Sequence, residues 1–438
     1  MFKNKKILVC GMAKSGQSVA RLLKEMGAIV TAQDKKDKIE DWDPEGIELY
    51  LGKDPDNIVE NFELIIISPG ITVYAPFVKK AQALNIPVWG EAELAYRLCP
   101  CKMLAITGTN GKTTVTTLVY EILKQYNPGT VVGGNIGIPL TELVTSLTED
   151  NLVVAEISSF QLETIAAFKP AISAVLNMTP DHLERHHTME NYIAMKARIF
   201  ENQSTNDMTV LNYDNPITRE MKPPGRVIYF SATKILKTGV YLRDGLICAN
   251  LEGVEQIITE ISSLKILPEN ALAATAISMC AGATADMVAL GLKSAKGVPH
   301  RMEYIATIAG VEYYNDSKAT NTDAAIKAIE TANAPMILIG GGYDKNTDFT
   351  PWVQSFHGKV EELIIIGQTT QKIIDTCTIL GFTSYSTAET LQDAVLIAKE
   401  KARPGQKIIL SPACASFDMF KNFEERGDMF KNYVLDFM

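Results

Sequence analysis

The sequence predicts an α/β protein of three domains built on mostly parallel sheets. Short apolar runs alternate with segments of helical periodicity along the chain, which is the pattern of parallel strands joined by helices. Glycine-rich or polar turns follow these runs, as they do at the carboxyl edge of parallel sheets. The length of 438 residues also exceeds what one hydrophobic core normally serves. We expect domains at residues 1–92, 93–298 and 299–438.

The first domain begins with a Rossmann-like strand–helix–strand unit. Its expected elements are a strand at residues 5–10, a turn at 11–16, a helix at 17–26 and a strand at 29–33 followed by Asp34. The turn resembles the dinucleotide fingerprint, but Ala13 replaces the middle glycine, so this signal alone is weak. A further strand at 64–67 ends in the turn 68–70. A diphosphate-bearing ligand fits between the two turns.

The second domain carries the most informative stretch, a phosphate-binding loop at residues 105–114. Gly108 and Gly111 let several N–H groups point at one anion, while Lys112 adds positive charge and Thr113 a metal-seeking hydroxyl. ATP or GTP is the expected ligand of this P-loop. The general pattern has a further glycine where Ile106 stands, and the shorter loop points away from ordinary switch GTPases.

The rest of the second domain predicts a mostly parallel sheet covered on both faces. We expect a helix near Glu93, strands at 102–107, 131–133, 152–156 and 171–176, one packed helix at 270–289 and a hinge at 297–301.

The third domain is a smaller Rossmann-like α/β unit. Its expected strands at 311–314, 337–339, 363–366 and 407–410 end in the loops 316–321, 340–345, 367–368 and 411–416. These loops should cluster on one edge of the sheet. Loops 316–321 and 411–416 precede helices, and helix N-termini favour anionic groups. The residues of each loop could instead serve only to cap the following helix.

Several residues of the second domain are candidates for binding a metal ion. Glu156 ends a strand at the edge that presents the phosphates, so we expect it to bind magnesium rather than only cap the next helix. His182, His186 and His187 lie close together in the sequence, and zinc is one interpretation. A single His182 on a nucleotide-bound divalent ion is more economical, which leaves the other two as solvated loop residues.

Lys196 lies in a helical segment, and the plain interpretation is one more surface lysine. A partly buried lysine of lowered pKa can instead react with carbon dioxide as the free amine, giving an anionic carbamate able to bind a second magnesium ion.

Composition limits the partners. The net charge of -9 and the pI of about 5.3 argue against nucleic acid. No apolar stretch reaches the length of a membrane span, and no signal peptide is evident. Seven scattered cysteines suit reduced thiols, and Cys99 and Cys101 lack the second pair that a zinc site needs. We expect a cytoplasmic monomer without nucleic-acid or membrane partners.

Taken together, the motifs resemble the Mur ligases along the whole chain. They are residues 107–114, 133–137, 156–163, 181–185, Lys196, 300–301, 316–321 and 411–427. The long motifs Asp-Ser-Lys-Ala-Thr-Asn and Ser-Pro-Ala-Cys-Ala-Ser-Phe-Asp-Met-Phe-Lys-Asn-Phe-Glu-Glu-Arg-Gly resemble most closely the branch that adds D-glutamate. The resemblance implies an ATP-dependent ligase of peptidoglycan synthesis that phosphorylates the alanine carboxylate of UDP-N-acetylmuramoyl-L-alanine and releases ADP and phosphate.

The resemblance also implies roles for individual residues. ATP would be bound by Gly108, Thr109, Asn110, Gly111, Lys112, Thr113, Thr114, Asn270, His300, Arg301, Asp316 and Lys318. The UDP-sugar would contact Ser15, Asp34, Lys35, Lys36, Ser68, Gly70 and Asn135, and D-glutamate would contact Thr320, Lys345, Ser416 and Phe423. Two Mg²⁺ ions would be held by Thr113, Glu156, His182 and a carbamylated Lys196, and catalysis would involve Lys112, Asn135, Glu156, His182 and Lys196.

Some matches are imperfect, and other functions stay open. Residues 265–270 lack a His-Asn pair often seen in relatives, and Lys35-Lys36 replaces a Thr-Arg of some members, so the adenine and uridine contacts are uncertain. One rival is a ligase of the same superfamily with another acceptor, such as a folylpolyglutamate synthetase or the lysine-adding or diaminopimelate-adding relatives. Others are a nicotinamide oxidoreductase, which leaves Lys112, Glu156 and Lys196 without a task, and a nucleotide switch without a covalent product.

Overall fold

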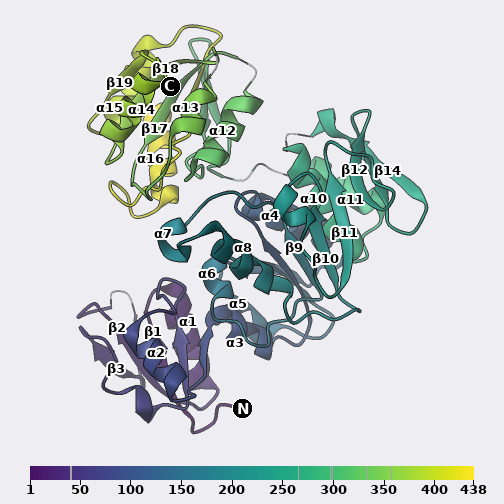
Figure 1. Cartoon of the computed structure of the whole chain (residues 1–438), viewed down its shortest axis with the longest axis vertical. Coiled ribbons are helices and arrows are strands. Elements are labelled where there is room, and N and C mark those ends of the chain that lie inside the picture. The colour runs from purple at the N-terminus through teal and green to yellow at the C-terminus, as the bar shows by residue number, and fades with distance from the viewer. Residues whose placement is uncertain (40–41, 265, 296, 298, 333, 357) are drawn as a thin grey trace. The chain divides into compact units, whose positions relative to one another are not determined.

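The computed structural model describes residues 1–39, 42–264, 266–295, 297, 299–332, 334–356 and 358–438. These residues form three sheets, which confirms the predicted α/β class (Figure 1). They group into two compact units, one of residues 1–180 and 185–295, the other of the short segment Asp181–Glu184 with the C-terminal part of the chain. The predicted boundary at residue 298 lies outside the described residues, so the proposed domain limits stay a prediction.

The N-terminal sheet is five-stranded and parallel, in the order β3-β2-β1-β4-β5. Its elements are β1 (Lys6–Cys10), α1 (Lys14–Glu25), β2 (Ile29–Asp34), β3 (Glu48–Leu51), β4 (Leu64–Ile67), α2 (Pro76–Ala83) and β5 (Val88–Gly90). All four residues of β4 are buried, as expected of a central strand covered on both faces. Helix α1 begins three residues earlier than predicted, inside the glycine turn, because Gly16 packs against the backbone of Gly11, where a Cβ would lie 2.0 Å from the carbonyl oxygen.

The central sheet has nine strands in the order β14-β13-β12-β11-β10-β9-β6-β8-β7. The strands are β6 (Lys102–Thr107), β7 (Thr130–Gly134), β8 (Leu152–Glu156), β9 (Ile172–Val175), β10 (Met208–Asn212), β11 (Arg226–Ser231), β12 (Gly239–Arg243), β13 (Leu246–Asn250) and β14 (Glu255–Glu260). The helices are α3 (Glu91–Leu98), α4 (Lys112–Tyr126), α5 (Leu140–Leu143), α6 (Ser159–Leu162), α7 (Leu183–His186), α8 (Met189–Ala197), α9 (Pro216–Arg219), α10 (Pro268–Cys280) and α11 (Ala285–Ser294).

Hydrophobic cores cover both faces of this sheet. Helices α4, α10 and α11 pack on one face, and α3, α5 and α8 contribute to the core on the other (Figure 1). Strands β12, β13 and β14 form an antiparallel extension that the sequence analysis missed. The single helix predicted at 270–289 is also wrong. It is broken after Cys280, because Gly282 takes a φ of 102° and Thr284 caps a new helix, α11.

The C-terminal sheet has six strands in the order β15-β16-β20-β17-β18-β19. Its elements are β15 (Glu303–Ile308), β16 (Val311–Asn315), α12 (Thr322–Thr331), β17 (Met336–Gly341), α13 (Thr350–Gln354), β18 (Val360–Ile366), α14 (Thr370–Ile379), β19 (Tyr385–Thr387), α15 (Leu391–Lys401), β20 (Lys407–Leu410) and α16 (Phe423–Leu435). Among the strand pairs described in this sheet, β15–β16 alone is antiparallel. The loops after β16, β17, β18 and β20 therefore meet at the carboxyl edge, as predicted.

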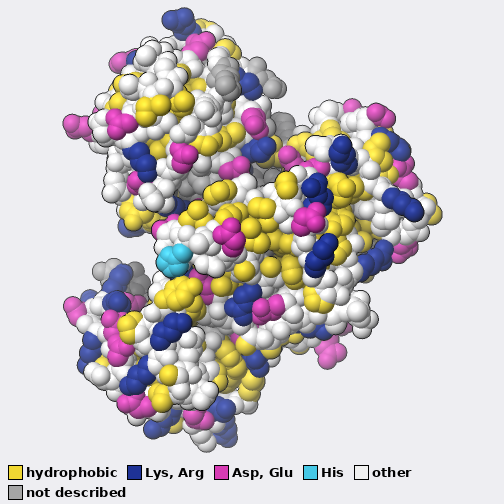
Figure 2. All heavy atoms as spheres, viewed as in Figure 1, with side chains coloured by type: hydrophobic (Ala, Val, Ile, Leu, Met, Phe, Trp, Pro, Cys, Tyr) yellow, Lys and Arg dark blue, Asp and Glu magenta, His cyan; other side chains and the backbone are white. Residues whose placement is uncertain are grey.

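Basic and acidic side chains are interspersed on the face shown in Figure 2. Within the part of the chain that the structure describes, no helix is both long enough and apolar enough to span a lipid bilayer.

Candidate active site

The carboxyl edge of the central sheet brings the predicted catalytic loops together. Strands β9, β6, β8 and β7 are consecutive neighbours, so the segments that follow them lie side by side. The phosphate loop follows β6, Glu156 ends β8, and Asn135 follows β7. The parallel pairing thus explains how residues distant in sequence come to share one site.

The phosphate loop has the backbone shape that an anion site needs. Gly108 has a φ of 149° and Gly111 a φ of 83°, and both values favour glycine. Gly111 caps α4 without a side chain to occupy the N–H groups of the first turn. A Cβ on Gly111 would lie 2.6 Å from Oδ1 of Asn270, so that predicted ATP residue stands directly beside the loop. Thr113 and Thr114 are half-buried in the first turn of α4.

The first half of the loop is held by hydrogen bonds within the protein. The Thr109 N–H donates to the carbonyl of Asn177, and its hydroxyl donates to the carbonyl of Thr179. The Asn110 N–H donates to the side-chain oxygen of Asn177, whose amide donates back to Asn110 O. The ammonium of Lys112 donates to the carbonyls of Gly108 and Thr109, at 3.0 and 2.8 Å. Hydrogen bonds of Thr109, Asn110 and Lys112 therefore fix the shape of the loop.

Glu156 is almost completely buried, with an exposed fraction of 1%. Its Oε1 accepts a hydrogen bond of 2.7 Å from the side-chain amide of Asn135. Its Oε2 is buried and has no hydrogen-bond partner among the residues the structure describes. A buried carboxylate oxygen is costly without a partner, and a divalent cation is the kind of ligand that would satisfy it. Glu156 thus fits the predicted magnesium site.

Lys196 is buried, with 2% of its surface exposed, so the interpretation as a surface lysine is wrong. It lies in the last turn of α8, where its Nζ donates to the hydroxyl of Thr107 at 3.3 Å and stands 5.0 Å from the ring centre of Tyr192. Thr107 ends β6 at the start of the phosphate loop. This brings the Lys196 amine to the same edge as the loop.

The three clustered histidines have different environments. His182 has a φ of 54°, belongs to the segment Asp181–Glu184, and contacts the carboxylate of Glu184 at 3.3 Å. His186 is buried and hydrogen-bonded to Ser159 Oγ at 3.0 Å, so its prediction as a solvated loop residue is wrong. His187 is exposed beside the ring of Tyr74. Among the described residues, no group of three or more His, Cys, Asp or Glu side chains is arranged to hold a metal ion.

The predicted UDP-sugar loops of the N-terminal sheet are joined to each other. The carboxylate of Asp34 accepts N–H bonds from Met12 at 2.7 Å and from Lys36 at 3.0 Å. Gly11 packs so closely on the next loop that a Cβ would lie 2.7 Å from the Cβ of Ser68. Gly70 is open, Ser15 is half-buried in α1, and Lys35 pairs with Asp54 at the surface. Asp34 therefore holds the turn after β1 and the segment after β2 together at the carboxyl edge of this sheet.

In the C-terminal sheet, Asp316 connects two predicted ligand loops. It is buried, and its oxygens accept from Ser411 Oγ at 2.8 Å and from the Met302 N–H at 3.2 Å. Burial raises the pKa of Asp316 to about 6, against the lowering effect of Arg301. Arg301 is thus electrostatically coupled to Asp316, consistent with their shared assignment.

Arg426 is a buried residue between two predicted ligand loops, and the sequence analysis left it without a role. Its guanidinium is buried and donates to Ser317 Oγ, to Ser317 O and to Cys414 O. It therefore ties loop 316–321 to loop 411–416, and burial lowers its pKa to about 10. Arg426 lies in the motif at 411–427, but only the fold shows that this arginine of α16 faces both loops.

The remaining predicted residues of the second unit lie around the same loops. The ammonium of Lys318 stands 4.6 Å from the ring centre of Phe423, which also contacts the ring of His300. Lys345 pairs with Asp181 at 3.5 Å within this unit. Ser416 is buried, and Thr320 is half-buried just before α12.

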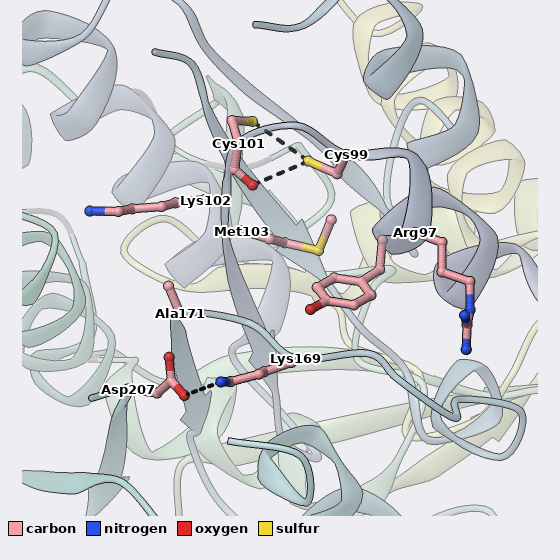
Figure 3. Close-up of a pocket in the computed structure, with 9 residues that line it drawn as sticks. Arg97, Cys99, Cys101, Lys102, Met103, Lys169, Ala171 and Asp207 are labelled. Carbon is pink, nitrogen blue, oxygen red and sulfur yellow. Dashed lines mark hydrogen bonds and ion pairs between the residues drawn. The ribbon is translucent and has the colours of Figure 1, made fainter. Parts of the chain in front are cut away.

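A separate pocket of about 330 Å³ lies at the opposite, amino-terminal edge of the central sheet (Figure 3). Its lining includes Cys99, Cys101 and Lys102, and it contains none of the predicted site residues. The two sulfur atoms are 3.6 Å apart, and burial, followed by the charge of Cys99, raises the pKa of Cys101 to about 12. This pocket is distinct from the loops described above.

Comparison with known proteins decides the family. Three family models match successive parts of the chain: the Mur ligase MurD-like N-terminal domain at residues 5–90, the Mur ligase middle domain at 106–267 and the Mur ligase glutamate ligase domain at 300–414. A curated protein of Thermoanaerobacter sp. (strain X514), UDP-N-acetylmuramoylalanine--D-glutamate ligase, is 46% identical over 99% of both chains. The chain belongs to the Mur ligase family. A protein of the same name from Alkaliphilus metalliredigens (strain QYMF) is 45% identical to this Mur ligase over 99% of its length and 98% of the relative's.

Solved structures of the family share the fold of this Mur ligase at low sequence identity. A pseudomurein peptide ligase type C from Methanothermus fervidus is 18% identical, with a TM-score of 0.62 over 99% of this chain and 100% of that one. MurF from Thermotoga maritima, solved in complex with ADP, is 15% identical, with a TM-score of 0.61 over 100% of this chain and 96% of that one. The predicted fold class is thereby confirmed.

Proposed function

We propose that this Mur ligase joins D-glutamate to UDP-N-acetylmuramoyl-L-alanine at the expense of ATP, as a step of peptidoglycan synthesis in the cytoplasm. The observation that carries the proposal is the full-length identity of 46% to a curated D-glutamate ligase. Glu156 and Lys196 are buried at the edge of the sheet that carries the phosphate loop, which supports a site for phosphoryl transfer there.

The reaction has two steps. An oxygen of the alanine carboxylate attacks the γ-phosphorus of ATP, ADP leaves, and an acyl phosphate forms. The free amine of D-glutamate then attacks the acyl carbon, inorganic phosphate leaves, and the new nitrogen loses a proton to give the amide. Neither step needs a protein nucleophile, because positioning and charge stabilisation suffice.

The first unit would hold the triphosphate and the acid end of the sugar substrate. Lys112 and the N–H groups at the start of α4 bind phosphate oxygens, and Asn270 lies beside them. Asn135, whose side-chain amide donates to Glu156, would also contact the substrate carboxylate. Gly108 and Gly111 allow the close approach of the backbone that these contacts need.

Two Mg²⁺ ions would be held by Thr113, Glu156, His182 and a carbamylated Lys196. When bound, the ions supply positive charge that reduces repulsion between the carboxylate and the phosphates. The carbamate forms when the neutral Lys196 amine adds to carbon dioxide and releases a proton. The Glu156 Oε2 atom has no hydrogen-bond partner among the described residues, which supports a metal ion beside Glu156.

The second unit would hold the amino acid and the nucleoside part of ATP. His300, Arg301, Asp316 and Lys318 are assigned to ATP, and Thr320, Lys345, Ser416 and Phe423 to D-glutamate. Arg426 holds together the two loops that carry Asp316, Lys318, Thr320 and Ser416. The N-terminal loops containing Ser15, Asp34, Lys35, Lys36, Ser68 and Gly70 would bind the UDP group.

A ligand-omission assay tests the function. We expect ADP release only when UDP-N-acetylmuramoyl-L-alanine and D-glutamate are both present, with the glutamyl product detected by mass. Lys112→Met should abolish turnover, whereas Lys124→Met, which changes an exposed lysine near the other end of α4, should not. Equal turnover with L-glutamate or another acceptor would reject the assignment in favour of a different ligase.

A further inference from the structure

Arg185 contacts three residues in ways that the catalytic assignments leave unused. Its Nε and Nη2 donate to the two carboxylate oxygens of Glu163, at 2.8 and 2.6 Å. The guanidinium carbon stands 4.1 Å from the ring centre of Phe160. Nη2 also donates, at 3.0 Å, to the carbonyl of Ile71. Side-chain exposures are only 13% for Arg185 and 3% for Glu163, so the ion pair is well shielded from water.

The carbonyl that accepts from Arg185 belongs to Ile71, the residue directly after the predicted UDP-sugar turn at 68–70. The Ile71 N–H donates to Ser68 O, which closes the turn that contains Gly70. The Ile71 side chain packs on the glycine turn after β1, where a Cβ on Gly11 would lie 3.2 Å from its Cδ1. Arg185 therefore contacts the residue that joins the two N-terminal loops.

A second contact connects the same two segments. The ring of His187, two residues after Arg185, lies 5.9 Å from the ring of Tyr74, three residues after Ile71. On its other side, Arg185 is anchored to Glu163 and Phe160, which lie in or next to α6, just after Glu156 and β8. The guanidinium thus links the loop after β4 to the α6 segment, which follows Glu156 in the chain.

We propose that Arg185 is a positioning residue that sets the UDP-binding loop at residues 68–71 relative to the site where the sugar's carboxylate reacts. The inference rests on the proposed function, because it assigns that loop to the UDP end of the substrate. A guanidinium is required, since its planar fork binds both Glu163 oxygens and still has a proton for Ile71. A lysine ammonium keeps the charge but cannot reproduce this geometry.

Arg185→Lys tests the proposal, and Arg97→Lys is its matched control. Arg97 also pairs with a buried glutamate, Glu93, at 2.6 Å and stands 4.2 Å from an aromatic ring, that of Trp89. It lies at the opposite edge of the sheet, beside the pocket in Figure 3. A general loss of an arginine ion pair should affect both variants alike, whereas a positioning effect should appear only in Arg185→Lys.

We expect Arg185→Lys to raise the KM for UDP-N-acetylmuramoyl-L-alanine by roughly tenfold or more, with kcat and the KM values for ATP and D-glutamate changed much less. Arg97→Lys should leave all four values near wild type. Guanidinium ion should partly restore Arg185→Ala, and ammonium should not. Equal changes in all three KM values, or an unchanged KM for the sugar substrate, would overturn the proposal.

A second measurement separates this inference from the proposed function. Amide hydrogen exchange in residues 68–75 should be faster in Arg185→Lys than in wild type or Arg97→Lys, whatever reaction the enzyme catalyses. A wild-type protein without ligase activity would reject the function alone. An active wild type with unchanged exchange and kinetics in Arg185→Lys would reject the positioning role alone.

Discussion

Asn135 donates a hydrogen bond of 2.7 Å to one oxygen of the buried Glu156 carboxylate, while the other oxygen lacks a hydrogen-bond partner among the described residues. Asn135 directly follows β7, Glu156 ends the neighbouring strand β8, and the Asn135 N–H also donates to the Glu156 carbonyl. The carboxylate is therefore fixed in orientation with one oxygen still able to take a ligand. Most buried carboxylate oxygens in folded proteins have a hydrogen-bond partner, so this oxygen is a candidate for binding a cation.

Glu156→Gln should lower kcat by on the order of 100-fold or more, because the amide keeps the shape of the side chain but removes the charge that a cation needs. The measurement is the rate of ADP release as a function of Mg²⁺ concentration. The exposed Glu190→Gln is the control. Wild-type rates in Glu156→Gln at every Mg²⁺ concentration would contradict a metal-binding role.

Lys196→Ala should be inactive and should regain part of its activity when bicarbonate or a small carboxylate is added, because the added anion can replace the carbamate charge. Wild-type activity should fall when carbon dioxide is removed from the buffer. Lys293→Ala changes an exposed lysine and should behave as wild type in both experiments. Full activity of Lys196→Ala without additives would refute the carbamate.

Local sequence signals predicted the strands and the phosphate loop well. Leu64–Ile67, Lys102–Thr107, Leu152–Glu156 and Lys407–Leu410 were predicted with their observed limits, because a short apolar run bounded by turns is a strong signal of a buried strand. The position of Glu156 next to the phosphate loop also followed from strand ends alone.

Features that depend on tertiary packing were missed. The run of alanines at 270–289 has continuous helical periodicity, and only Gly282 and the Thr284 cap reveal the break. His186 was taken for a solvated residue because no local signal shows that it packs against Tyr192 and binds Ser159. The same holds for Arg426, which binds one loop that follows β16 and another that follows β20. No local signal shows that its side chain lies between them.

Arg426→Lys should weaken the C-terminal loops without unfolding the first unit. The compact ammonium of lysine cannot reach all the acceptors on Ser317 and Cys414 that the three nitrogens of the guanidinium reach, so buried carbonyls lose partners at a cost of about 2–4 kcal/mol. The KM values for ATP and D-glutamate should rise, while that for the UDP-sugar should change little. Steady-state kinetics and urea unfolding measure the two effects, and a raised KM for the UDP-sugar alone would contradict this role.

Glu91 provides a pH-dependent contribution to stability away from the reacting groups. Its carboxylate is buried and accepts from the N–H and the hydroxyl of Thr141, at 2.7 and 3.0 Å. The Thr141 hydroxyl also bonds to Ser18 Oγ at 2.8 Å, which links α3, α5 and α1. Burial raises the pKa of Glu91 to about 6, against the lowering effect of the Thr141 bonds.

A carboxyl group whose pKa is higher in the folded state than in the unfolded state takes up protons on folding, so its contribution to stability increases as the pH falls. Between pH 8 and pH 5, the free energy of unfolding of wild type should therefore rise by about 1 kcal/mol relative to that of Glu91→Gln, which cannot titrate. Urea unfolding of both proteins at the two pH values measures this difference. Glu149→Gln changes an exposed glutamate and is the control: its free energy of unfolding should change with pH by the same amount as that of wild type. If Glu91→Gln also ran parallel to wild type, the carboxylate would be ionised over the whole range, and the Thr141 bonds would outweigh the effect of burial.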